Sequence, residues 1–195
     1  MNVGHVTGSG DEFSINYHVV ERANFSWDVG GQLSGNKNQI KDLGGLQFIT
    51  VGQGGQAQNR VGFSIADIFM YKVLSAKIDA TGAVIESICD GGTGRSGLEQ
   101  GGAPVPCSQA PRVLWGHSQP TWSMGFNTSV TLWKNLRLFA QLDGNGGNWM
   151  DDTEIRALHN LGLTKAVILR NDPFLQAYRA IEADAVGTYK AGFLK

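Results

Sequence analysis

The sequence predicts a mostly β fold built from antiparallel hairpins. Glycine accounts for 27 of the 195 residues, and the glycines gather in clusters between apolar segments. Because glycine permits tight reversals and is poorly tolerated inside helices, this punctuation favours strands joined by turns. Several segments also alternate apolar and polar residues, which is the period of a strand with one buried face.

The first predicted hairpin joins residues 13–20 to residues 25–34 through the short segment 21–24. One face carries Phe13, Ile15, Tyr17, Val19, Phe25, Trp27, Val29 and Leu33. The other face carries Ser14, Asn16, His18, Ser26, Asp28, Gln32 and Ser34. A connection this short is typical of a hairpin turn.

The second predicted hairpin pairs residues 122–132 with residues 136–142 around a turn at Lys134 and Asn135. Its alternation is regular except at Phe139, which interrupts the polar side. Strands of ten or eleven residues exceed the usual five or six and match the 9–11 of a tilted membrane strand. Long strands of a soluble sandwich fit the pattern equally well, because periodicity does not reveal what covers the apolar face.

The remaining segments give weaker signals. Residues 46–51 and 63–78 are expected to be extended, with poorer alternation. A helix is expected over 152–161, where Asp152 supplies a cap, and another from Pro173 to a stop at Gly187.

Charge and hydropathy exclude several classes of function. The net charge is −1, so a nucleic-acid partner is not expected, because such binding needs a basic face. The sequence contains no run of about 18 apolar residues that would form a transmembrane helix. Met1 is followed by neither a basic segment nor an apolar one, so a signal peptide is not expected.

Catalytic residues, a cofactor and a resident metal are not expected. The histidines at 5, 18, 117 and 159 lack ligand spacing, and neither a nucleophile elbow nor a phosphate-binding loop occurs. One segment imitates a calcium loop, with Asp143, Asn145, Gly147, Asp151 and Glu154 at the EF-hand intervals. Asn148 stands where the sharp turn requires glycine, so we interpret the segment as a polar loop that leaves a strand, with Asp151 or Asp152 capping the next helix.

Two pairs of residues remain as candidate sites. Cys89 and Cys107 lie in a stretch rich in glycine, proline and serine, and they are interpreted as a loop-closing disulfide formed in an oxidising compartment. The alternative is two free thiols in a reduced cytosol. Trp115 and Trp149 stand beside glycines in loop-like contexts, where a tryptophan binds a ligand or packs the loop onto its own scaffold.

Three motifs occur in a fixed order along the chain. The first covers residues 13–38, with Phe-Ser-Trp at 25–27 and Asn-Lys-Asn at 36–38. The second covers 116–139, with a Gly-x-x-x-Pro start and a turn at Lys134 and Asn135, and the third covers 189–195. Together they resemble SusC/RagA-type TonB-dependent outer-membrane transporters. The resemblance implies an all-β chain: a fragment of an antiparallel transmembrane β-barrel whose long extracellular loops, 80–120 and 143–188, carry short helices.

The same resemblance implies a location and a role. Residues 1–195 would be a partial C-terminal barrel region, without the plug domain and the terminal strands, in the cell outer membrane. Phe13, Trp27, Phe126 and Leu138 would face outer-membrane lipid, whereas Asn16, Asp28, Asn127 and Arg137 would line the lumen. The complete protein would import a glycan or peptide without chemistry, with the TonB complex and a surface substrate-binding lipoprotein as partners.

Two other classes of protein fit the sequence. A secreted β-sandwich would bind carbohydrate through Trp115 and Trp149 and would bury its apolar faces against each other. A structural or adhesion domain would instead depend on the Cys89–Cys107 bridge.

Overall fold

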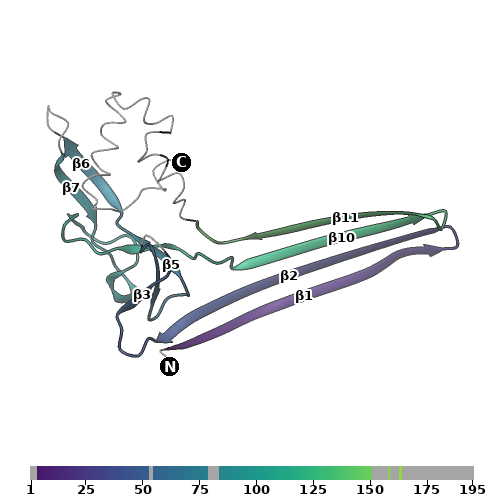
Figure 1. Cartoon of the computed structure of the whole chain (residues 1–195), viewed down its shortest axis with the longest axis horizontal. Coiled ribbons are helices and arrows are strands. Elements are labelled where there is room, and N and C mark those ends of the chain that lie inside the picture. The colour runs from purple at the N-terminus through teal and green to yellow at the C-terminus, as the bar shows by residue number, and fades with distance from the viewer. Residues whose placement is uncertain (1–3, 53–54, 79–83, 151–157, 159–162, 164–195) are drawn as a thin grey trace. The chain divides into compact units, whose positions relative to one another are not determined.

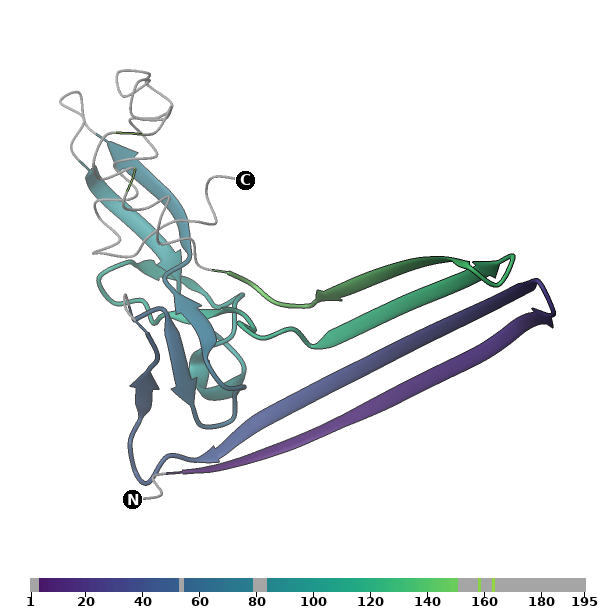
Figure 2. The same ribbon diagram turned by 45° about the vertical axis from the view of Figure 1, so that its right-hand side comes forward.

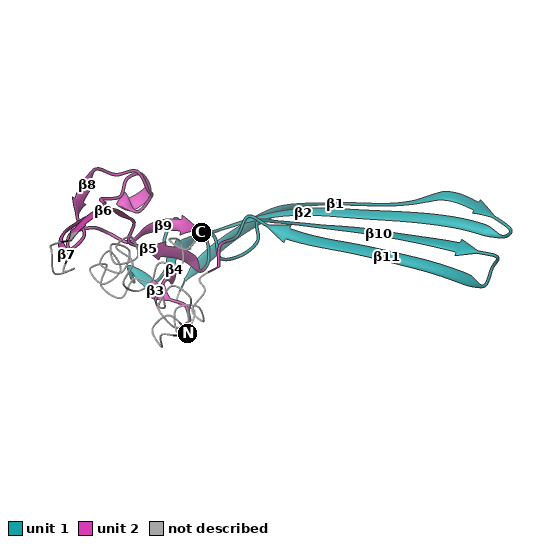
Figure 3. Cartoon of the chain, turned by 90° about the horizontal axis from the view of Figure 1, so that it is seen from above, with its two compact units in different colours: residues 1–48, 59–65, 117–148 teal, residues 49–58, 66–116, 149–195 magenta. Residues whose placement is uncertain are grey.

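The computed structural model describes residues 4–52, 55–78 and 84–150, together with Leu158 and Leu163. The chain divides into two compact units (Figure 3). Unit 1 comprises residues 1–48, 59–65 and 117–148, and unit 2 comprises residues 49–58, 66–116 and 149–195. The expected helices over 152–161 and 173–187 lie outside the described residues, apart from Leu158. Among the described residues, no helix has the length and apolar character needed to cross a membrane.

Unit 1 is dominated by a four-stranded antiparallel sheet in the order β1-β2-β10-β11 (Figure 1). Its strands are β1 (His5–Arg22), β2 (Phe25–Asp42), β10 (Trp122–Leu132) and β11 (Leu136–Gly146). Both predicted hairpins are therefore confirmed. The pairing of β2 with β10 joins them side by side, as the turned view also shows (Figure 2).

The first two strands are longer than the alternation predicts. Each has 18 residues, because His5–Gly10 continues to pair with Asn36–Asp42 beyond the apolar stretch. Backbone ladders need no apolar face, so a polar segment extends the hairpin without leaving a signal in the periodicity.

One residue of the first strand was placed on the wrong face. The pairing moves from His18 opposite Asp28 to Val20 opposite Trp27, so Val19 forms a β-bulge. A bulge inserts one extra residue and reverses the alternation. Val20, and not Val19, therefore shares the face of Trp27.

The turn of the second hairpin runs through Trp133 and Lys134, whose φ angles are 50° and 64°. This left-handed backbone matches the twist of antiparallel strands, although side chains disfavour it. The amide of Trp133 donates a hydrogen bond of 2.9 Å to the carbonyl oxygen of Asn24, so the turns of the two hairpins are joined.

At the opposite end of the sheet, residues 59–65 pair with the extension of β2. The amide of Ile40 donates to the Phe63 carbonyl at 2.9 Å, and Gly62 donates to the Ile40 carbonyl at 2.8 Å. The Asn38 side chain accepts a hydrogen bond of 2.7 Å from the amide of Ile65. Ile40 and Phe63, together with Leu43, are buried here and form a small core.

Unit 2 is built on two smaller sheets, β3-β4-β5-β9 and β6-β7-β8. Their strands are β3 (Phe48–Thr50), β4 (Ala57–Arg60), β5 (Asp67–Met70), β9 (Val113–Gly116), β6 (Val73–Ile78), β7 (Val84–Asp90) and β8 (Pro104–Pro106), with the 3-10 turn η1 at Arg95–Gly97. The extended segments expected in 46–51 and 63–78 are thus confirmed in part. The segment 80–120, expected to be an extracellular loop, contains β7, β8 and β9, which pair with one another or with β5 and β6.

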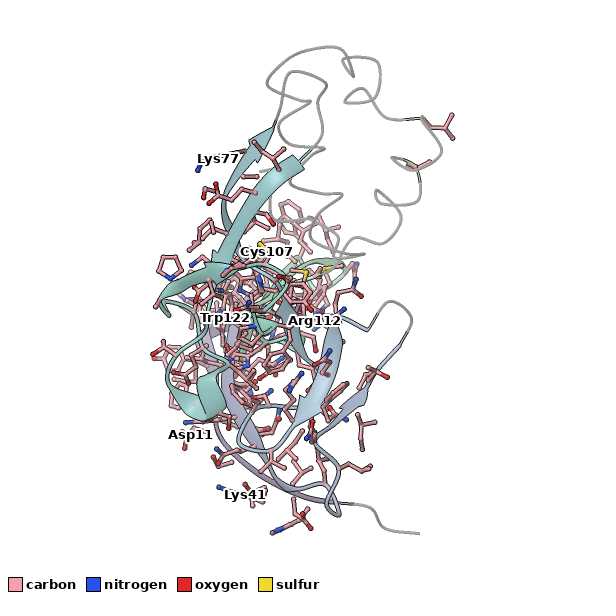
Figure 4. The ribbon with its side chains drawn as sticks, turned by 90° about the vertical axis from the view of Figure 1, so that its left-hand side faces the viewer. Asp11, Lys41, Lys77, Cys107, Arg112 and Trp122 are labelled. Atoms are coloured by element: carbon pink, nitrogen blue, oxygen red, sulfur yellow. A yellow bond between two sulfur atoms is a disulfide. The ribbon has the colours of Figure 1, made fainter. Side chains whose placement is uncertain are left out.

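Unit 2 has a compact core. The buried side chains of β5 and β9 are Ile68, Phe69, Met70 and Val113. Cys89 of β7 and Cys107, which follows β8, are buried as well. A bridge joins the sulfurs of Cys89 and Cys107, whose Cα atoms are 4.8 Å apart (Figure 4).

The buried carboxylate of Asp90 organises the glycine-rich loop 91–102. Its oxygens accept hydrogen bonds from the backbone amides of Gly92 at 2.9 Å, Gly101 at 2.7 Å and Gly102 at 2.8 Å. The Lys72 ammonium lies 3.7 Å away. A Cβ at Gly102 would lie 2.4 Å from the backbone nitrogen of Gly92, so this close approach of two backbones requires glycine.

These contacts set the ionisation of Asp90. Burial disfavours the charged form, but the hydrogen bonds from Gly101, Gly92 and Gly102 and the charge of Lys72 outweigh burial and lower the pKa of Asp90. A lowered pKa in the folded state means that the stabilisation is complete above the ordinary aspartate range, about pH 4. It is lost as the pH falls through the lowered pKa of the folded state.

Replacing Asp90 with Asn will loosen the 91–102 loop. The amide group of asparagine donates where one backbone amide needs an acceptor, and we expect a loss of about 2 kcal/mol. Hydrogen exchange of the peptide covering 91–102 will be faster in Asp90→Asn at pH 7. The wild type will approach the variant only below about pH 4.

The matched control is Glu86→Gln, which breaks the ion pair between Glu86 and Lys77. Both side chains are largely exposed, so the pair contributes about 0–1 kcal/mol. Equal exchange rates in the two variants would show that Asp90 does not hold the loop.

Candidate functional site

The two faces of the long sheet have opposite chemistry. Partners that lie directly opposite in an antiparallel pair share a face, so the register defines rows across the strands. One row contains Phe13, Leu33 and Met124, and another contains Leu142 and Phe126. These apolar side chains remain exposed, from 45% for Met124 to 64% for Phe13.

This exposure bears on the soluble sandwich alternative. That fold requires the apolar face to be covered by a second sheet. Within the described residues the face is open, with Ile15 at 54% exposure, Tyr17 at 63% and Leu138 at 55%. An open apolar face of this size indicates contact with a membrane or a partner.

The opposite face is polar. Asn16, Asn127 and Gln141 fall in one row, interrupted at Gly30 on β2. A Cβ at Gly30 would lie 2.6 Å from Oδ1 of Asn16 and 2.7 Å from Nδ2 of Asn127, so glycine gives the flanking amides room to lean over β2. In a neighbouring row Ser34 and Ser123 share a hydrogen bond of 2.7 Å.

A polar network crosses the same face nearer the turns. The ring nitrogen Nδ1 of His18 contacts one carboxylate oxygen of Asp28. The hydroxyl of Ser129 lies 3.4 Å from the second oxygen, and Nη2 of Arg137 donates to that hydroxyl at 3.4 Å. One carboxylate and its neighbours therefore link all four strands.

The polar face also contains a shallow depression of about 240 Å³. It is lined by Gln32, Gly125, Phe126, Asn127, Phe139, Gln141 and Asp143. The sequence placed Gln32, Asn127 and Gln141 on one face, but it did not indicate that they line a depression together with Asp143.

The structure brings Trp115 and Trp149 together in unit 2. Their rings pack edge to face, with centroids 6.2 Å apart and planes at 75°. The indole nitrogen of Trp115 donates to the Met70 carbonyl at 3.3 Å, and the ring of Trp149 lies directly over Gly116. Trp149 thus packs onto β9, the strand that contains Trp115, and keeps 41% of its surface exposed.

Asp143 and Asn145 of the calcium-like spacing lie inside β11, opposite Gly125 and Ser123. A paired strand cannot wrap around an ion as an EF-hand loop does. His5 and His18 lie on β1, His117 follows β9, and His159 lies outside the described residues. In the part of the chain that the structure describes, no three metal-ligating side chains gather.

Two residues of the Asn-Lys-Asn motif have structural roles that the sequence did not specify. Asn38 binds the amide of Ile65, and Nδ2 of Asn36 donates to the Pro120 carbonyl at 3.3 Å. These contacts attach β2 to residues 59–65 and to the segment that precedes β10. Asp90 was also missed, because an isolated aspartate beside glycines carries no distinguishing pattern.

The comparisons with known proteins agree with this geometry. No protein-family model matches the chain. TonB-dependent receptor P26 of Formosa agariphila is 30% identical over an alignment of 166 residues, and the match covers 80% of this chain and 16% of the receptor. The chain therefore spans only a small part of the length of this curated relative.

Solved structures show the same fold. The RagAB peptide importer in its closed-closed state has a TM-score of 0.55 at 19% identity. The RagAB peptide transporter has a TM-score of 0.55 at 20% identity. Each match covers 76% of this chain and 16% of the other chain. The resemblance drawn from the three motifs is confirmed, as is the antiparallel β fold that it implies.

The two faces can be distinguished by one matched pair of substitutions in the middle of β11. Leu142 lies on the apolar face opposite Phe126, and its neighbour Gln141 lies on the polar face opposite Asn127. On a lipid-facing surface Leu142→Arg would place a charge in hydrocarbon, and it should then destabilise the protein folded in lipid vesicles by about 2–4 kcal/mol. Gln141→Arg should leave the urea unfolding midpoint nearly unchanged. Equal effects would contradict a lipid-facing apolar surface.

The bridge between Cys89 and Cys107 can be tested independently. Replacing both cysteines with serine should lower the stability of unit 2 by about 3 kcal/mol, the loop-entropy estimate for a separation of 18 residues. Proteolysis of the segment 84–107 under native conditions will report this loss. A reducing agent should accelerate cleavage of the wild type and leave the double variant unaffected. An unchanged wild type would show that the thiols are not bonded.

Proposed function

This chain is related to TonB-dependent receptors of the SusC/RagA type, and we propose that it forms part of the barrel wall and the surface loops of an outer-membrane transporter. The observation that carries the proposal is the long sheet, whose apolar face is open and whose opposite face is polar. A transmembrane barrel needs this division, because its strands meet lipid on one side and the lumen on the other.

The lengths of the connections between the long strands indicate how the chain is oriented in the outer membrane. The hairpin turns at residues 23–24 and 133–135 are short, whereas the segment from Leu43 to Thr121 is long and contains residues 49–58 and 66–116 of unit 2. Outer-membrane barrels have short periplasmic turns and longer extracellular loops. We therefore assign the turns to the periplasmic side and residues 43–121 to the cell exterior, where a disulfide is stable.

The role of the complete protein follows from the family. It would import a glycan or a peptide, energised by the TonB complex and supplied by a surface lipoprotein, without chemical change to the cargo. Residues 1–195 would contribute a C-terminal part of a barrel of about 22 strands, with the plug domain and the terminal strands elsewhere in the protein. Among the described residues the outer edges of β1 and β11 have no partner strand, which supports this proposal, because hydrocarbon does not tolerate open sheet edges.

The proposal is tested in the bacterium that encodes the protein. An epitope-tagged protein should sediment with the outer membrane and resist carbonate extraction. Deletion of the gene and disruption of TonB should abolish growth on the same glycan or peptide, and an inducible copy of the gene should restore growth in the deletion strain only. A tagged protein found in the periplasm or the medium would overturn the proposal and favour the secreted β-sandwich.

A further inference from the structure

The depression on the polar face has a distinctive set of side chains. Three of the side chains that line it are carboxamides: Gln32 from β2, Asn127 from β10 and Gln141 from β11. Among the described residues, the hydrogen bond from Nε2 of Gln141 to Asp143, at 2.7 Å, is the only one made by these three amide groups. The amides of Gln32 and Asn127 therefore present donors and acceptors to the lumen.

The hollow exists because β10 has glycine at position 125. A Cβ there would lie 2.8 Å from Nε2 of Gln32 and 3.2 Å from Oδ1 of Asp143. Any larger residue would push these side chains aside or fill the space. Because Gly125 has no side chain, the polar ends of Gln32 and Asp143 can lie close over β10 and line the depression.

Phe139 adds an apolar surface to this polar site. It lies on the polar face of β11 opposite Ser129, and 60% of its surface is exposed. An exposed phenyl ring among amides offers a flat surface on which the apolar side of a ligand can stack. Hydroxyl groups both donate and accept hydrogen bonds, as carboxamides do, so the amides and the ring together match a sugar residue.

The charge and the backbone narrow the class of ligand. Asp143 is the only charged residue among those that line the depression, and it would repel a sulfate or a uronate. Gln32 and Gly125 lie in β2 and β10, the inner strands of the sheet, which are paired on both sides, so a peptide cannot add beside them as a further strand. The volume is below the roughly 300–1,000 Å³ of sites that enclose a drug-sized molecule, so the depression accommodates one unit of a longer chain.

We propose that Gln32, Asn127, Gln141 and Phe139 form a lumen subsite that binds one neutral sugar residue of a carbohydrate cargo. This inference rests on the proposed function and selects carbohydrate as the cargo class. Asp143 positions Gln141 through their hydrogen bond and accepts from a sugar hydroxyl.

The test uses the complete protein in detergent and titration calorimetry. The probes are neutral gluco-, manno-, galacto- and xylo-hexaoses, a sulfated galacto-hexaose and a neutral hexapeptide. At least one neutral hexaose should bind more tightly than the sulfated sugar and the peptide. Asn127→Ala combined with Gln141→Ala should weaken that binding about tenfold or more, as expected for lost hydrogen bonds. Gly125→Ala, which keeps every polar group but fills the hollow, should also weaken it.

The matched control is Asn16→Ala. Asn16 shares the polar row of Asn127 and Gln141 but does not line the depression, so its removal should leave the affinity unchanged. Equal losses in the control and the double variant would overturn the subsite, as would preferred binding of the sulfated sugar or the peptide, or no binding of any neutral hexaose. The proposed function is tested separately by membrane insertion and TonB-dependent growth. If both are observed together with one of these binding results, the subsite is refuted and the proposed function stands.

Discussion

The ladder between β2 and β10 is the constraint on which the rest of unit 1 depends. Each hairpin is local, closed by a short turn, and an isolated two-stranded hairpin is marginal in water. The ladder joins them through paired residues from Trp122 opposite Gly35 to Leu132 opposite Phe25. It also brings together residues that are 101 positions apart, such as Trp27 and Thr128, whose side chains share a hydrogen bond of 2.9 Å. Backbone hydrogen bonds, and not a packed core, therefore hold this sheet together.

The register of that ladder decides what each face can do. A shift by one residue would move every polar side chain of β10 to the apolar side. The bulge at Val19 shifts the register by one residue locally, near the turn of the first hairpin. As a result, Val20 lies on the same face as Trp27. The glycines at 30 and 125 act differently: they remove side chains from the polar face and let the flanking amides approach. The residues that set the strand pairing therefore also determine which side chains each face of the sheet presents.

Unit 2 is stabilised differently from unit 1, because it contains a glycine-rich segment with few apolar residues. Its backbone groups need partners wherever the loop is buried. The Asp90 carboxylate supplies acceptors for three amides, and Arg112 donates to the Gly55 carbonyl at 2.9 Å. Side chains that satisfy the backbone therefore take over part of the role that apolar packing has elsewhere. The bridge between Cys89 and Cys107 adds a constraint between β7 and the segment that follows β8.

The alternation of residues 13–20 and 122–132 was sufficient to predict both hairpins and, except at Val19, the side chains on each face, because that information is local. The polar ends of β1 and β2 and the short strands β7 and β8 could not be predicted, since their pairing satisfies the backbone and leaves no period in the side chains. The subsite could not be predicted from the sequence for a further reason, which is that it depends on which strands pair. Gln32 and Asn127 meet only because β2 pairs with β10, and Gly125 becomes a hollow only when Gln32 and Asp143 flank it. A site assembled across a long-range ladder is a property of the register, and it follows from the sequence only when the pairing partner is known.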